Sequence, residues 1–271
     1  MDIAEKTLQL KKDFDDVYDK ALDVGHQIGY DFGYTQGKAD GRNEGYMDGY
    51  SQSESDFWDV VQKSGKRTNV EYMFAQWDSE YIRPKYKVVA NSSNRTIAMF
   101  RHCRKLKKIE KEYFDLSAYT PVTTASSGDS NYQTFLYCDK LEEIEDIGIQ
   151  GGGYYYTYNN CQKLHTIEVM RCVIKGEYTA VFTSCNALKN ITIEGEIGKN
   201  FDIHYSPLST ESIVSIIEHL SDTSGATLTL NTNAVNSMVF PYTSPYTNIT
   251  YNSWDELIAT KTNWTISKAS A

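Results

Sequence analysis

Residues 182–191 read Phe182-Thr183-Ser184-Cys185-Asn186-Ala187-Leu188-Lys189-Asn190-Ile191, so that an aromatic residue, a cysteine, a leucine and an isoleucine follow one another at steps of three. The same spacing occurs in three earlier segments, which begin at Phe100, Phe135 and Tyr158. The four cysteines are separated by 35, 23 and 24 residues. Intervals near 23 are typical of leucine-rich repeats, and the longer first interval indicates an insertion within Thr120–Ser130. The pattern predicts a solenoid of stacked repeats.

The repeat also explains the cysteines. Four of the five occupy the same repeat position, where a small apolar side chain fills a turn. We expect these four to be reduced and stacked in a buried column, and their spacing is not that of a zinc site. The fifth, Cys172, lies outside the repeat register and is either reactive or a packing residue. The four repeat cysteines are Cys103, Cys138, Cys161 and Cys185.

Each Leu-x-x-Ile step is expected to open a short strand that stacks in parallel on its neighbours. The outward residues after the first three isoleucines are then Glu110, Glu145 and Glu168. Stacked like charges are unfavourable. A glutamate row without structural benefit therefore indicates a candidate binding face for a cation or a basic partner, although a solvated edge is the alternative. The same alignment pairs Lys107 with Glu142 and Lys108 with Glu143.

The N-terminal sixty residues form an acidic arm. They hold 14 acidic and 6 basic side chains, so their net charge is 6 − 14 = −8, out of −9 for the whole chain. Leu10, Phe14 and Val17 belong to a heptad seam that predicts a short coiled coil, stable only with a partner. An amphipathic helix packed on the chain's own body is the alternative.

Glycine then recurs at every fourth position of the arm, with tyrosine often beside it. In a helix, small residues at this spacing allow a second helix to approach closely and imply that the two wrap around each other in a right-handed sense. A flexible linker is the alternative. We expect one long helix over residues 3–56 and a dimer or trimer assembled through residues 3–50. The residues concerned are Gly25, Gly29, Gly33, Gly37, Gly41, Gly45 and Gly49, with Tyr30, Tyr34, Tyr46 and Tyr50.

These segments predict an α+β chain: a long N-terminal oligomerisation helix, then a short repeat solenoid with helical and strand end caps. Ser209 is a helix N-cap, and the apolar spacing after it predicts a helix that closes the stack. A strand over Thr227–Leu230, a helix near Trp254–Thr260 and a strand near Trp264–Ile266 follow. The expected domains are residues 1–56 for the arm, 57–95 for an aromatic N-terminal cap, 96–208 for the solenoid and 209–271 for the C-terminal cap.

Composition excludes several functions. The chain has 271 residues and a net charge of −9, which argues against a nucleic-acid partner. No apolar stretch approaches the length of a membrane span, and the start lacks the pattern of a signal peptide. No H-x-x-x-H pair, nucleophile elbow or nucleotide-binding loop is present. We therefore expect no catalytic, cofactor-binding or metal-binding residues and no enzymatic activity.

Several local motifs together resemble a known family. They include the repeats, Phe57-Trp58-Asp59, Pro84-Lys85-Tyr86, Ser206-Pro207-Leu208-Ser209 and the Gly-Tyr arm within residues 29–50. The chain is similar to leucine-rich repeat proteins of the BspA type, and more closely to a subgroup encoded by phages and prophages of gut Gram-positive bacteria.

This resemblance covers nearly the whole chain and implies a tail or baseplate protein of the virion, made in the bacterial cytoplasm without a signal peptide. It implies contacts with other tail proteins and with a host-surface component, but it assigns no functional residue. The longer first repeat interval departs from plain repeat proteins. A bacterial surface adhesin and an intracellular scaffold are the alternatives.

Overall fold

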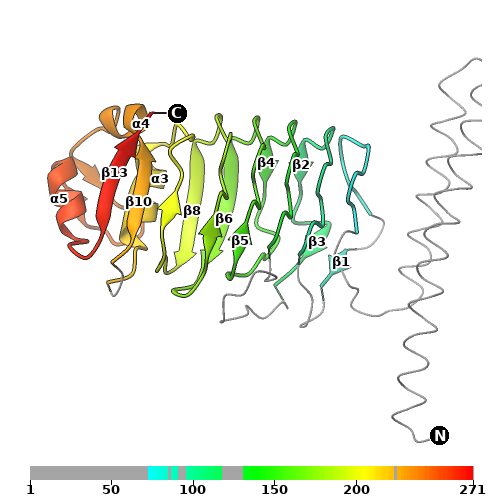
Figure 1. Ribbon diagram of the computed structural model, residues 1–271, viewed down its shortest axis with the longest axis horizontal. Helices are drawn as coiled ribbons and strands as arrows, with labels where there is room; N and C mark the ends of the chain where they lie inside the picture. Colours follow the sequence, from blue (N-terminus) through cyan, green and yellow to red (C-terminus); the bar gives the residue numbers. More distant parts are fainter. Residues whose placement is uncertain (1–72, 85–86, 91–95, 118–130, 223–224, 271) are drawn as a thin grey trace, which may run out of the picture. The chain divides into compact units, whose positions relative to one another are not determined.

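A computed structural model of the protein describes residues 73–84, 87–90, 96–117, 131–222 and 225–270, all of which belong to the compact unit Arg67–Ala271. Within these ranges the chain winds into coils that lie side by side (Figure 1). Short strands in each coil pair in parallel with the equivalent strands of neighbouring coils. The coils end in a C-terminal region that contains the described helices.

The largest sheet takes one strand from each of four coils. Its order is β2 (Lys108–Ile109), β4 (Glu143–Ile144), β6 (Thr166–Cys172) and β8 (Asn190–Gly195). The register places Ile109, Ile144, Ile167 and Ile191 in one buried row. The expected alignment of the four segments is therefore confirmed.

Two smaller ladders lie on the return path of the coils. β1 (Val88–Val89) pairs with β3 (Phe114–Asp115), and β5 (Tyr154–Tyr155) pairs with β7 (Tyr178–Thr179), in parallel in both cases. Turns then lead to the next strand of the main sheet. In these turns the N–H of one coil donates to the carbonyl of the next, as from Phe135 to Thr157 at 2.8 Å.

The turns contain two left-handed residues per coil. One stands two positions before the repeat aromatic and the other stands just before the cysteine. In the coil of Phe135 they are Gln133 with φ 56° and Tyr137 with φ 61°; in the next coil they are Tyr156 with φ 53° and Asn160 with φ 61°. A helix cannot continue through such residues, so the coils return through turns and strands.

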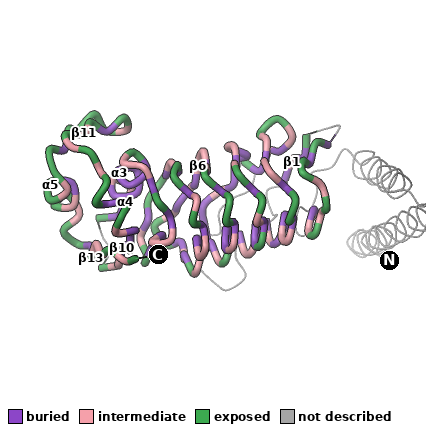
Figure 2. Tube along the Cα trace, turned by 90° about the horizontal axis from the view of Figure 1, so that it is seen from above, coloured by how far each residue is buried: buried purple, intermediate pink, exposed green. Residues whose placement is uncertain are grey.

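The core is built from columns of like residues. Rings of Phe74, Phe100, Phe135, Tyr158 and Phe182 stack with successive centroid distances of 5.5, 5.2, 5.5 and 5.4 Å. All five are at most 1 % exposed. Each coil carries buried stretches between exposed and half-buried ones, as Figure 2 shows.

Phe74 belongs to a further coil that the repeat pattern did not reveal. Its N–H donates to the Met99 carbonyl at 2.8 Å, and Val88 pairs with Phe114. In this coil Trp77 stands where the other coils have cysteine. The described part of residues 57–95, expected to be an aromatic plug, thus continues the stack.

Helix α3 (Thr210–Glu218) covers the last strand of the main sheet. Ser209 caps it, as expected, by accepting from the Ser212 N–H at 3.3 Å. The hydroxyl oxygens of Ser212 and Ser215 accept the N–H groups of Ile191 and Ile193 in β8, both at 2.9 Å. The helix therefore satisfies strand donors that no further strand reaches.

The C-terminal region continues beyond this helix. A second parallel sheet has the order β13 (Thr265–Ala269), β10 (Thr227–Asn231) and β9 (Phe201–Asp202). The expected strand over Thr227–Leu230 is confirmed, as is the helix near Trp254, which is α5 (Trp254–Ala259). The remaining elements are helix α4 (Thr232–Asn236) and the antiparallel pair of β11 (Tyr242–Thr243) and β12 (Thr250–Tyr251).

The expected α+β class is wrong. The described residues are mostly strands in several parallel sheets, and their few helices, α3, α4 and α5, are short. The left-handed turns explain this, because they leave no room for a helix in a coil. The long helix expected over residues 3–56 is not part of the described fold and lies outside the described residues. So does the whole of the expected insertion within Thr120–Ser130, although β2 and β4 on either side of it keep their register.

Candidate functional site

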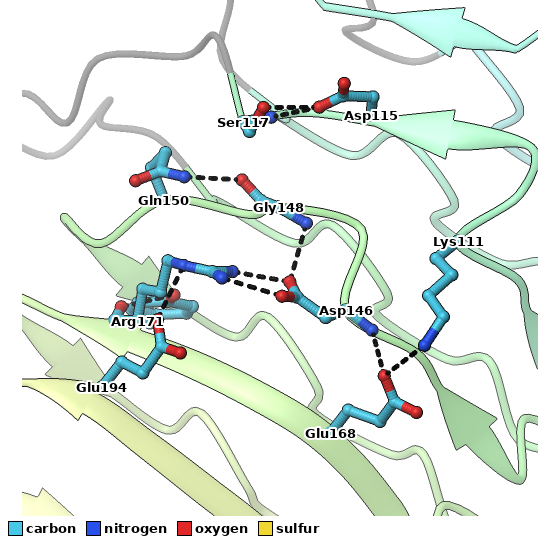
Figure 3. Close-up of polar contacts among 10 residues, drawn as sticks. Lys111, Asp115, Ser117, Asp146, Gly148, Gln150, Glu168, Arg171 and Glu194 are labelled. Atoms are coloured by element: carbon cyan, nitrogen blue, oxygen red, sulfur yellow. Dashed lines mark hydrogen bonds and ion pairs between the residues drawn. The ribbon is translucent and has the colours of Figure 1, made fainter.

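The sequence predicts a candidate site at the glutamate row that follows the isoleucines of the main sheet. Figure 3 shows the polar contacts around part of this row. Glu110, Glu145 and Glu168 do occupy equivalent positions, because the isoleucines before them share one row. We call this row and the charged residues bonded to it the charged face.

Two of the glutamates connect one coil to the coil before it. Glu145 Oε2 accepts the backbone N–H of Lys111 at 2.9 Å, and Glu168 Oε2 accepts the backbone N–H of Asp146 at 2.9 Å. Each carboxylate therefore satisfies a donor just beyond the end of a two-residue strand. The glutamate row has a structural benefit, so the expectation that it has none is wrong.

Glu110 differs from the other two glutamates, because the preceding coil offers it no backbone N–H. Lys107 donates its N–H to the Glu80 carbonyl at 2.9 Å, and Glu142 donates its N–H to the Lys107 carbonyl at 2.8 Å. Glu80 therefore occupies in its coil the position that Lys107 occupies in the next one. Four residues further on, Pro84 occupies the position equivalent to Lys111. Proline has no N–H. Glu110 instead accepts two bonds from the Arg83 guanidinium, at 2.8 and 3.0 Å.

Lysines complete the same face. Lys108 Nζ lies 3.2 Å from Glu143 and 2.7 Å from Glu145, and Lys111 Nζ lies 3.6 Å from Glu168. The bond from Lys108 is the main reason that the pKa of Glu145 is lowered. The expected Lys108–Glu143 pair is thus confirmed. Lys107 is aligned with Glu142 in the backbone, but its ammonium pairs with Glu80 at 2.7 Å.

Arg171 joins three coils at the far end of the face. A bulge in β6 between Ile167 and Met170 sets Arg171 opposite Glu194 of β8. Its guanidinium donates to Asp146 at 2.6 and 2.8 Å and lies 3.1 Å from Glu194. Asp146 also accepts the Gly148 N–H at 2.9 Å. The bidentate Arg171 contact is the main cause of the lowered pKa of Asp146.

The charged face therefore holds its carboxylates in ion pairs. The lowered pKa values of Glu145 and Asp146 do not suit general acid catalysis, because a catalytic acid needs a raised pKa. Among the described residues, no group of three or more His, Cys, Asp and Glu side chains could hold a metal ion. Each glutamate of the row has a basic partner, so the row is less available than the sequence indicated. Its role as a binding face stays a prediction.

The cysteines lie inside the stack. All five are unpaired and buried, and the thiols of Cys103, Cys138, Cys161 and Cys185 donate to backbone carbonyls of the preceding coil at 2.9 to 3.0 Å. The acceptors are the aromatic residues of that coil. Burial raises the pKa of each thiol, to about 12 for Cys185 and also for Cys172. The buried column is confirmed, and Cys172 is a packing residue rather than an accessible nucleophile.

A second surface was not predicted from the sequence. The left-handed turns of two middle coils present Tyr132, Gln133, Tyr137, Tyr156 and Asn160, and we call these five residues the turn face. The repeat alignment could have indicated this surface. It places tyrosines and amides at positions where the coil of Phe182 has Ala180 and Ser184.

Residues expected to carry oligomerisation lie outside the described residues. They are Leu10, Phe14 and Val17 of the heptad seam, the seven glycines from Gly25 to Gly49, and the four tyrosines beside them. No helix in the described part of the chain is long and apolar enough to cross a membrane. No family model, curated protein or solved structure matches this chain.

Proposed function

We propose that the protein is a non-enzymatic structural and recognition protein that presents its stacked coils to a protein or to a cell surface. The observation that supports this most directly is the contrast between two surfaces. Charged groups are paired with one another on the charged face, whereas aromatic and amide side chains project from the turn face. Rigid aromatic rings among adaptable hydrogen-bonding groups are typical of recognition surfaces.

The setting that we propose is a phage tail or baseplate. The resemblance to phage-encoded BspA-type repeat proteins supports it, as does the glycine and tyrosine pattern of the arm. In this proposal residues 3–50 assemble two or three copies, other tail proteins hold the assembly, and the coils engage a component of the host surface. No cofactor takes part.

The proposal is tested by two measurements on the full chain. Light scattering should give the mass of a dimer or trimer, whereas a chain that starts at Asp56 should be monomeric. Fluorescently labelled full chain should bind intact Gram-positive cells in a saturable manner that excess unlabelled chain prevents. A monomeric full chain that binds no cells would contradict the proposal.

A further inference from the structure

The turn face differs from the rest of the surface in its chemistry. Its five residues, Tyr132, Gln133, Tyr137, Tyr156 and Asn160, carry no formal charge, although 23 % of the chain is charged. Tyr137 and Tyr156 are each 40 % exposed, which places them among the most exposed large apolar side chains described. These five residues therefore offer aromatic rings and amides to a ligand, and no charge of their own.

The backbone at the two exposed tyrosines is held by the next coil. Tyr137 and Tyr156 are left-handed residues, and their N–H groups donate to the next coil, to Asn159 and to Thr179, both at 3.0 Å. The two tyrosines belong to adjacent coils. A residue whose backbone is fixed in this way loses less conformational entropy on binding, which favours affinity.

Neighbouring side chains add to this order. The His102 ring packs against the Tyr137 ring with 4.9 Å between centroids. Burial is the main reason that the pKa of His102 is lowered, with the Arg101 and Arg104 charges adding to it, so His102 is neutral at pH 7.

The amides are organised as well. Gln133 Nε2 donates to the Tyr132 hydroxyl at 3.1 Å, and the Asn160 amide donates to the Asn159 side chain. Asn159 in turn donates to the Ala180 carbonyl at 3.3 Å. The hydrogen-bonding groups of the turn face are thus set before any ligand arrives.

We propose that the turn face binds a neutral saccharide chain. A sugar ring has an apolar C–H face that packs on an aromatic ring, and its hydroxyl groups form an edge that amides can bond. This combination matches the exposed tyrosines, the glutamine and the asparagine of the turn face. A protein partner would call for a continuous apolar centre, and a polyanion would call for lysines and arginines in the face. The proposal rests on the proposed recognition function and names its ligand class.

The test uses the full chain and a glycan array that carries neutral and anionic oligosaccharides. The variant is Tyr137→Ser with Tyr156→Ala, which installs the residues that the coil of Phe182 already has at these positions, Ser184 and Ala180. Its melting temperature should stay close to that of the parent chain. The matched control is Tyr81→Ala, which removes a ring that is 39 % exposed outside the turn face.

We expect the parent chain to bind at least one neutral oligosaccharide, with little dependence on salt. The double variant should bind it about tenfold more weakly or worse, as for the loss of an anchoring aromatic side chain, and Tyr81→Ala should bind it normally. Absence of neutral glycan binding, equal binding by the double variant, or binding of anionic glycans alone would overturn the proposal.

The cell-binding assay separates this proposal from the broader one. If the double variant still binds Gram-positive cells as the parent does, the saccharide site is wrong and the recognition function stands. If neither chain binds cells and the full chain is monomeric, the recognition function itself fails.

Discussion

Single residues determine how tightly the coils can approach one another. Each repeat cysteine is small enough to be fully buried between coils, and it donates its S–H to a carbonyl of the preceding coil, as Cys161 does to Phe135 at 3.0 Å. A thiol in this position is neutral in the folded protein. Because the unfolded chain exposes it, its ionisation favours unfolding.

We therefore predict that the protein loses stability in alkali. Burial raises the pKa of Cys161 in the folded protein. The stability that the neutral thiol contributes is therefore complete below the unfolded pKa of about 8.5 and falls as the pH rises above that value. Urea unfolding at pH 7, 8.5 and 10 should show this decline. In Cys161→Val the decline should be shallower by up to about 1.4 kcal/mol per pH unit. Rapid reaction of the folded protein with a thiol reagent at pH 8 would contradict the buried column.

Among the elements, α3 has the clearest structural task. The hydroxyl of Ser215 is fully buried and accepts the Ile193 N–H at 2.9 Å. Any strand at the end of a stack leaves backbone donors open, and these donors are costly when no water reaches them.

Ser215→Ala is accordingly expected to destabilise the protein by about 1–3 kcal/mol, because it leaves the Ile193 N–H buried without an acceptor. Chemical denaturation measures the change. Ser237→Ala is the matched control, since Ser237 is exposed and its hydroxyl only donates to the Ala234 carbonyl at the end of α4. Equal effects of the two substitutions would show that the hydroxyl does not cap β8.

The charged face supplies a second prediction about elements. Arg171 lowers the pKa of Asp146. This contact therefore stabilises the protein above the unfolded pKa of about 3.9, and the stabilisation is lost as the pH falls through the folded pKa. Asp146→Asn should cost about 1–3 kcal/mol at pH 7 and should weaken the acid dependence of unfolding.

Glu196→Gln serves as its control, because Glu196 is an exposed carboxylate close in sequence to Glu194. That substitution should change the stability at pH 7 by less than about 0.5 kcal/mol. If Asp146→Asn kept the full acid dependence of the parent chain, the contact with Arg171 would not be the source of the lowered pKa.

At the scale of the whole described unit, each coil depends on its neighbours for a buried surface. The main sheet is closed at its C-terminal end by α3 and the region beyond it (Figure 1). Stacked repeats need such an end structure, because an open last coil exposes apolar side chains and unpaired strand groups.

Removal of residues 209–271 is therefore expected to cause aggregation. The truncated chain would expose the edge of β8 together with the apolar surface that Ile213 and Ile216 now cover. Static light scattering at matched concentrations of the full and truncated chains measures the effect. A truncated chain that remained soluble, with the oligomeric state and thermal unfolding of the full chain, would show that the C-terminal region is not needed to close the stack.

The sequence by itself determined the repeat register. Phe135, Cys138, Leu141 and Ile144 recur at a spacing that only stacked coils can bury together, so their alignment followed from burial alone. The helix at Ser209 was equally predictable, because a cap residue and an apolar stripe are local signals.

Only the tertiary structure decided how the coils return and what their charges do. Left-handed backbone at residues such as Tyr137 and Asn160 leaves no periodic trace in sequence, so the strand-rich class was missed. The coil of Phe74 was hidden because Trp77 replaces the cysteine. The partners of Glu145 and Glu168 are backbone groups of another coil, which a pattern of side chains cannot reveal. Whether a side chain is buried can be predicted from its residue type, whereas its hydrogen-bond partners depend on where backbone atoms far apart in the sequence come to lie.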